Sequence, residues 1–175
     1  PLWSVTPLFI IIFIDSMGLG LLFPILNDIL VDPASSFLPD IVSASQRELI
    51  YGGIIAIFML AWFFGAAILG DLSDRIGRKK VLMLCLAGTF VGYLLAGLSV
   101  LVHSMVLLVV GRIIAGFTAG SQPIAQAALI DISAPQKKAR NLGLMVLAAS
   151  LGFVFGPICG GVFSDNSLVS WFNFE

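Results

Sequence analysis

Two charged side chains interrupt otherwise apolar stretches of the sequence. Asp15 stands between Ile14 and Ser16 in the first stretch, and Arg112 interrupts a later one. An ion near the centre of a bilayer costs several kcal/mol, so each side chain is expected to face the protein interior or a water-filled cavity. A carboxyl group can bind and release a proton, which an amide cannot do. Asp15 is therefore a candidate proton-coupling residue, and a purely structural buried acid is the alternative.

Helix geometry places the two charges at similar depths. With a first span that enters near Trp3, Asp15 lies about 18 Å along its helix and about 12 Å from the far boundary of a bilayer core roughly 30 Å thick. Arg112 lies about 10 Å inside the same boundary if its span starts near Met105. We therefore predict an ion pair between Asp15 and Arg112, because pairing lowers the cost of burying each charge.

Five apolar runs are long enough to be the membrane spans that position these residues. They cover residues 3–26, 49–69, 81–102, 105–130 and 142–163. The alternation typical of a membrane β-barrel is missing from the sequence, so the runs predict an all-α membrane protein. Residues 1–175 are interpreted as one helix bundle.

Composition excludes several other classes of protein. Hydrophobic residues make up 59% of the chain and charged residues only 11%, which is incompatible with an ordinary soluble domain. There is no basic face that would predict a nucleic-acid partner. Cys85 and Cys159 fall inside apolar runs, where packing is expected rather than metal binding, and no cofactor is predicted. No loop gathers a nucleophile, a base and an oxyanion donor, so we do not expect an enzyme.

The basic residues are confined largely to two segments. Residues 70–80 contain four of the nine Lys and Arg residues, and residues 136–140 contain three. Short loops rich in Lys and Arg stay in the cytoplasm, which predicts that both segments are cytoplasmic loops and that the loop containing Asp40 lies on the other side.

Further polar and small residues mark three of the spans. Tyr93 lies beside small residues in span three, and Gln122 and Gln126 lie deep in span four. The two amides predict either interhelical hydrogen bonds or the lining of a cavity, and the sequence leaves both open. Span five contains small residues that permit close packing and a proline that removes a backbone hydrogen bond: Gly152, Gly156, Pro157, Gly160 and Gly161. This pattern suits gating, and simple packing is the alternative.

Four segments resemble motifs of the major facilitator superfamily. Residues 70–79 resemble its cytoplasmic signature, and residues 112–116 resemble its span-four motif, with Ala115 where glutamine is usual. Residues 152–161 resemble the span-five signature of proton-coupled drug antiporters. Residues 13–24 are similar to the first span of tetracycline-type exporters. Gly92 stands before Tyr93 where those exporters carry an acid, which puts that particular substrate in question.

The resemblance implies a larger transporter of about twelve spans in two halves, with a substrate site between them. The chain would then be the N-terminal half, and residues 171–175 would be the approach to a sixth span. Its partner would be a C-terminal half of the same transporter, or a second copy of this chain in its place.

The charged segment is then expected to act as a conformational switch. Gly77 provides a tight turn, Asp71 faces a helix start in the other half, and Arg75 pairs with Asp131 at the foot of span four. The alternative is that these charges only anchor the loop. The residues assigned to the switch are Gly70, Asp71, Asp74, Arg75, Gly77, Arg78 and Asp131.

We therefore predict a secondary transporter that uses protons to export a small amphipathic compound or drug. Its expected partners are that small molecule, protons and the lipid bilayer, and its expected location is a bacterial inner membrane. Two alternatives remain at this point: an importer or symporter of a metabolite or siderophore, and a membrane scaffold subunit that transports nothing.

Overall fold

The computed structural model describes residues 6–33, 35–39 and 41–164, which contain six α-helices. They are α1 (Thr6–Leu30), α2 (Ala44–Ile76), α3 (Arg78–Leu101), α4 (Met105–Thr118), α5 (Ser121–Ile132) and α6 (Lys138–Ser164), with a short 3-10 turn, η2 (Pro135–Lys137). Five helical segments are long and apolar enough to cross a membrane, the fourth being α4 and α5 together. The predicted all-helical membrane fold is confirmed. Predictions at Trp3, Asp40 and residues 171–175 lie outside the described residues.

The charged segment between spans two and three is helical, although a loop was predicted there. α2 runs almost directly into α3, with only Gly77 between them. Gly77 has a φ of +99°, which side-chain-bearing residues rarely adopt, so it makes the predicted tight turn. A helix can extend beyond the bilayer where opposite charges four residues apart stabilise its exposed turns. Two such pairs are present, Asp71–Arg75 and Asp74–Arg78.

Span four is broken in the middle, although one continuous helix was predicted. α4 ends at Thr118 and α5 begins at Ser121. Pro123 in the first turn of α5 has no N–H and so cannot continue the hydrogen-bond pattern of α4. Gly120, at the break, lies so close to α2 that an added Cβ would come within 2.7 Å of the Ala66 nitrogen. The break lets α4 pack on α2 and α3 while α5 contacts all four remaining long helices.

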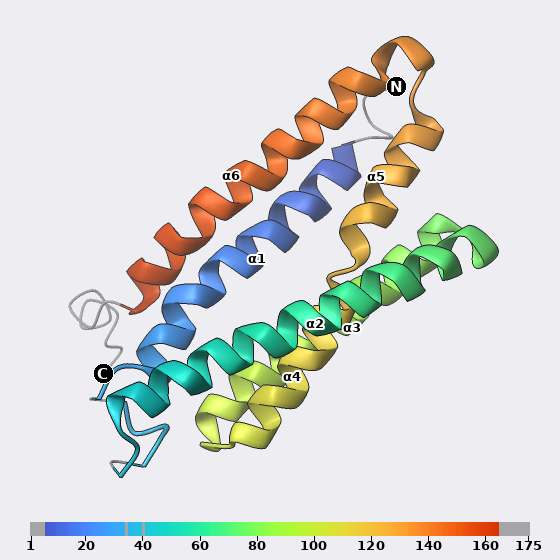
Figure 1. The fold of residues 1–175 in the computed structure, drawn as a ribbon. Coiled ribbons are helices and arrows are strands. Elements are labelled where there is room, and N and C mark those ends of the chain that lie inside the picture. The colour runs from blue at the N-terminus through green and yellow to red at the C-terminus, as the bar shows by residue number, and fades with distance from the viewer. Residues whose placement is uncertain (1–5, 34, 40, 165–175) are drawn as a thin grey trace, which may run out of the picture.

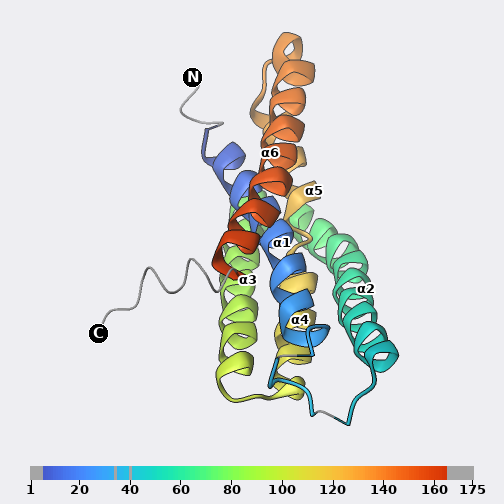
Figure 2. The ribbon, with the colours of Figure 1, turned by 90° about the vertical axis from the view of Figure 1, so that its left-hand side faces the viewer.

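The long helices form two groups, as Figures 1 and 2 show. α1 lies along α6, and α4 packs against both α2 and α3. Glycines permit the close approach in each group. A Cβ added at Gly156 would lie 2.5 Å from the Met17 carbonyl oxygen, and one added at Gly116 would lie 2.5 Å from that of Phe58. α5 then bridges the two groups.

Buried apolar side chains form one large cluster near the charged segment and another near the α1–α2 connection. The first includes Ile12, Val81 and Leu129, and the second includes Leu26, Ile54 and Leu108. Many other large apolar side chains on the outer faces are exposed in the chain alone, as expected for helices that meet lipid or further protein.

One buried arginine organises the connection between α1 and α2. Arg47 is only 3% exposed. Its guanidinium group donates to backbone carbonyl oxygens at the end of α1 and along the connection, those of Leu30, Asp32, Leu38, Pro39 and Val42. The connection is also tied to the α3–α4 turn, because His103 Nε2 lies 3.2 Å from Ser36 Oγ.

Candidate functional site

Asp15 lies at the break in span four. The residue is 8% exposed, and its Oδ2 accepts a hydrogen bond of 2.6 Å from Ser121 Oγ. This length is typical of a hydroxyl that donates to a carboxylate. Ser121 is the first residue of α5, so the carboxylate lies near the positive end of that helix dipole. A buried acid thus has a partner that favours its charged form.

A second polar contact joins the same two helices. Gln122 Nε2 donates to Ser16 Oγ at 3.5 Å, and Ser16 is fully buried next to Asp15. Gln122 and Gln126 also line a cavity of about 180 Å³ between α1, α5 and α6. Gln122 therefore has both roles that the sequence left open, an interhelical hydrogen bond and the lining of a cavity. Gln126 lines the same cavity.

Arg112 is fully buried, and the predicted ion pair with Asp15 is absent. Within the described part of the chain, none of its three guanidinium nitrogens has a hydrogen-bond partner. Its guanidinium carbon lies 5.3 Å from the centre of the Tyr93 ring, a cation–π distance. The prediction was wrong because helix rise sets the depth of a side chain but not the direction in which it points. In addition, the break in span four places Ser121, rather than Arg112, next to the Asp15 carboxylate.

Arg112 and Tyr93 line a cavity of about 330 Å³ between α1, α3 and α4. The remaining lining residues are apolar or glycine, among them Gly18, Leu22 and Gly97. This volume is at the small end of the range for ligand pockets. The cavity combines an apolar wall with one buried cation.

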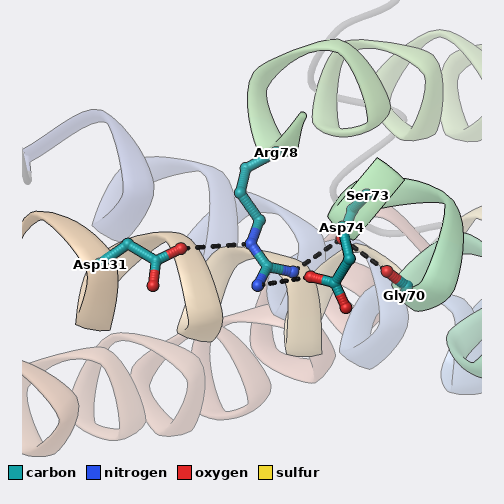
Figure 3. Close-up of polar contacts among 5 residues, drawn as sticks. All are labelled: Gly70, Ser73, Asp74, Arg78 and Asp131. Carbon is teal, nitrogen blue, oxygen red and sulfur yellow. Dashed lines mark hydrogen bonds and ion pairs between the residues drawn. The ribbon is translucent and has the colours of Figure 1, made fainter. Parts of the chain in front are cut away.

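The charged segment converges on Arg78, as Figure 3 shows. Arg78 Nη2 lies 2.7 Å from Asp74 Oδ1, and its Nε lies 3.3 Å from Asp131 Oδ2. Its Nη1 donates to Ser73 Oγ at 2.8 Å, and Ser73 in turn donates to the Gly70 carbonyl oxygen. We call these five residues the Arg78 cluster. It joins α2, α3 and α5.

The predicted partner of Asp131 was therefore wrong. Arg75 pairs with Asp71 at 2.9 Å, four residues away on the same exposed face of α2. Arg78, at the start of α3, is the residue that reaches Asp131 on α5. The sequence could not distinguish the two arginines, because both lie within a few residues of the turn and only the path of the chain at Gly77 decides which one faces α5.

The glycines of α6 pack against the backbone of α1. A Cβ added at Gly152 would lie 2.5 Å from the Phe13 carbonyl oxygen, and one at Gly160 would lie 2.6 Å from Pro24. Pro157 lies inside α6, which continues through it, and an added Cβ at Gly161 would meet nothing within 4 Å. Four of the five predicted residues thus lie at this interface, because a Cβ added at Gly20 of α1 would lie 2.8 Å from Pro157 Cδ.

Three polar residues at these sites, Ser16, Ser73 and Ser121, were not predicted, and neither was the role of Arg47 in the α1–α2 connection. Serines carry a weak signal in an apolar run, because their hydroxyl can also bond to the helix backbone. Pro123 was the available signal for Ser121, since a proline deep in span four indicates a helix start nearby.

The chain matches the family model described as Major Facilitator Superfamily over residues 8–173. It is 34% identical over 155 residues to the tetracycline resistance protein, class C, of Escherichia coli, covering 89% of this chain and 36% of that protein. It is 30% identical over 164 residues to the class H protein of Pasteurella multocida, covering 94% of this chain and 38% of that protein.

A relative outside bacteria is also similar. Major facilitator superfamily domain-containing protein 10 of Bos taurus is 30% identical over 126 residues, which cover 71% of this chain and 27% of that protein. The chain therefore spans less than two fifths of the length of these curated relatives.

Proposed function

Because the chain belongs to the major facilitator superfamily, we propose that residues 1–175 form the N-terminal half of a proton-coupled exporter of small amphipathic compounds. Tetracycline resistance proteins among its relatives support export of a drug-like molecule. The family and the five apolar helices indicate an integral membrane protein of transport type rather than an enzyme. In this proposal a C-terminal half, or a second copy of this chain, completes the transporter, and the basic segments face the cytoplasm of a bacterial cell.

The observation that carries proton coupling is the hydrogen bond between Asp15 and Ser121 at the break in span four. An ionised Asp15 accepts this bond beside the N-terminus of α5. Proton uptake removes the charge and with it the attraction to α5, so the contact between α1 and α5 weakens. A proton that binds two conformations unequally shifts their populations, which is what a coupled carrier requires.

Arg112 supplies the second charge of the cycle. Its guanidinium group has no hydrogen-bond partner among the described residues, so we propose that it pairs with substrate in another conformation. Tyr93, Gln122 and Gln126 line cavities on either side of α1 and are proposed to contact substrate. Discontinuous helices near mid-membrane are where secondary transporters bind ions and substrates.

The two ends of the half-transporter have different proposed roles. The switch comprises the Arg78 cluster with Asp71, Arg75 and Gly77, and Asp71 is proposed to face a helix start in the other half. The small residues of α6 (Gly152, Gly156, Gly160 and Gly161), with Pro157, are proposed to let α6 move against α1 as a gate. Gly152, Gly156 and Gly160 bring the backbones of the two helices close together, whereas Gly161 has open space beside it.

The test is substrate flux into or out of proteoliposomes that contain the full-length transporter, with and without an imposed pH gradient. Amphipathic probes, tetracycline included, serve as substrates. We expect Asp15→Asn to abolish gradient-driven flux, and Asp15→Glu to retain part of it because a titratable group remains. Asp28→Asn, near the end of the same helix, is the matched control and should behave like wild type. Wild-type gradient dependence in Asp15→Asn would return Asp15 to a structural role, and the direction of flux separates export from import.

A further inference from the structure

The buried guanidinium group of Arg112 has no compensating charge among the residues that the structure describes. It is fully buried, its nitrogens have no hydrogen-bond partner within the described residues, and Asp15 is engaged by Ser121. No acidic residue is among those that line its cavity. An uncompensated charge in a medium of low dielectric is costly, so a site that keeps one is suited to a ligand of opposite charge.

The cavity determines what else that ligand must be. Its volume is about 330 Å³, and apart from Arg112 and the Tyr93 hydroxyl its walls are aliphatic or glycine. Leu22 and Leu26 of α1 form one side, and Ala96 and Val100 of α3 form the other. A ligand that fills it must present an apolar body to these helices and a single anionic group to Arg112.

We infer that this cavity binds an amphipathic organic monoanion, whose carboxylate accepts hydrogen bonds from Arg112 and whose apolar body lies between α1 and α3. A planar guanidinium group presents paired N–H donors that match the two oxygens of a carboxylate. The Tyr93 ring lies 5.3 Å from the guanidinium carbon, and the three guanidinium nitrogens are buried without a hydrogen-bond partner within the described residues. The inference rests on the proposed transport function and names the substrate class for it: acidic amphipathic compounds rather than cationic ones.

The test compares three probes of one shape: 2-naphthoate, its neutral amide 2-naphthamide, and the cation 2-naphthylmethylammonium. Binding to the full-length protein in a neutral maltoside detergent is measured by equilibrium dialysis. We expect naphthoate to bind about 10- to 100-fold more tightly than the amide, the range expected for hydrogen bonds to a charged group. The cation should bind no better than the amide.

Variants assign the binding to this cavity. Arg112→Gln keeps a polar side chain and should lose the preference for naphthoate over the amide, whereas Arg112→Lys should retain part of it. Gly97 lines the cavity, and a Cβ added there meets nothing within 4 Å, so Gly97→Leu should fill the space without disturbing the helix contacts and should weaken binding of both naphthoate and the amide. Gly52→Leu, at an equally open position on α2 outside the cavity, is the matched control.

Three results would overturn the inference. The first is equal binding of naphthoate and the amide to wild type. The second is an unchanged preference for naphthoate in Arg112→Gln, since this would place the anion elsewhere. The third is binding of a fatty acid in place of naphthoate. Dialysis is done without a pH gradient, so a failure of proton coupling at Asp15 appears in the flux experiment and not here. A long-chain fatty acid that binds while naphthoate does not would assign the cavity to lipid and would also contradict a transported substrate.

Discussion

Arg78 and Arg112 are both arginines near the middle of the sequence, and they have opposite surroundings. All three guanidinium nitrogens of Arg78 contact a polar oxygen, on Asp74, Ser73 and Asp131. None of those of Arg112 does so within the described residues. Arg78 is 29% exposed on its side chain, whereas Arg112 is fully buried. The partly exposed charge therefore has hydrogen-bonded partners, whereas the buried charge has none of that kind among the described residues.

The contrast separates two uses of a charge. The Arg78 cluster holds three helices together through contacts that water screens, so each ion pair contributes little to stability. The cluster nevertheless links α2, α3 and α5. A buried charge that has no hydrogen-bond partner among the described residues, as at Arg112, is expected to be destabilising, which natural proteins tolerate mainly at functional sites. The Arg78 cluster therefore connects helices, whereas the surroundings of Arg112 resemble those of a binding site.

The largest expected effect concerns which side of the membrane each region faces. In a background without Cys85 and Cys159, we expect an impermeant thiol reagent to label Ile41→Cys on intact cells and to leave Lys138→Cys unlabelled until the cells are opened. Ile41 is 91% exposed in the α1–α2 connection, beside Asp40, and Lys138 begins α6. The reason is the concentration of basic residues at the Arg78 end. Labelling of Lys138→Cys in intact cells that is as strong as labelling of Ile41→Cys would contradict the predicted topology.

The next effect separates stability from activity at the two arginines. Arg112→Met should abolish transport yet raise the free energy of unfolding, on the order of 2 kcal/mol, because a similarly shaped apolar side chain replaces a buried unpaired charge. Arg78→Met should not stabilise the protein. The measurements are flux in proteoliposomes and thermal unfolding in detergent, both with the full-length transporter.

One outcome would contradict the proposed difference between Arg78 and Arg112. If Arg112→Met lowers the unfolding temperature as much as Arg78→Met does, Arg112 has a partner outside the described residues.

The smallest effect on stability is expected at the exposed pair Asp71–Arg75. Asp71→Asn and Arg75→Ala should each change the free energy of unfolding by no more than about 0.5 kcal/mol, because the pair lies four residues apart on a solvated helix face. Each should nevertheless reduce transport about 5- to 150-fold, the range of ordinary coupling free energies, if Asp71 acts on the other half. Parental transport rates in both variants would show that the segment only anchors the helices.

Much of the fold could be predicted from the sequence. Apolar runs of about twenty residues predict spans, since a bilayer permits few alternatives to a helix. Asp15, Arg112, Gly77 and the α6 glycines stood out because charge in lipid, a turn and close packing each demand unusual residue types. Their partners did not stand out: Ser121 is an unremarkable serine, and the choice between Arg75 and Arg78 depends on one turn.

The sequence by itself determined where the five apolar spans of the described residues lie, which polar residues fall inside them, and which segments are charged, because these follow from hydrophobicity and the rise of a helix. Only the tertiary structure decided which side chains meet. The break at Gly120 places Ser121 within hydrogen-bonding distance of Asp15, and the turn at Gly77 places Arg78 beside Asp131. The spacing of α1, α3 and α4 leaves an apolar cavity that Arg112 lines. Depth is a property of one helix, whereas contact depends on how several helices are turned about their axes and where they break.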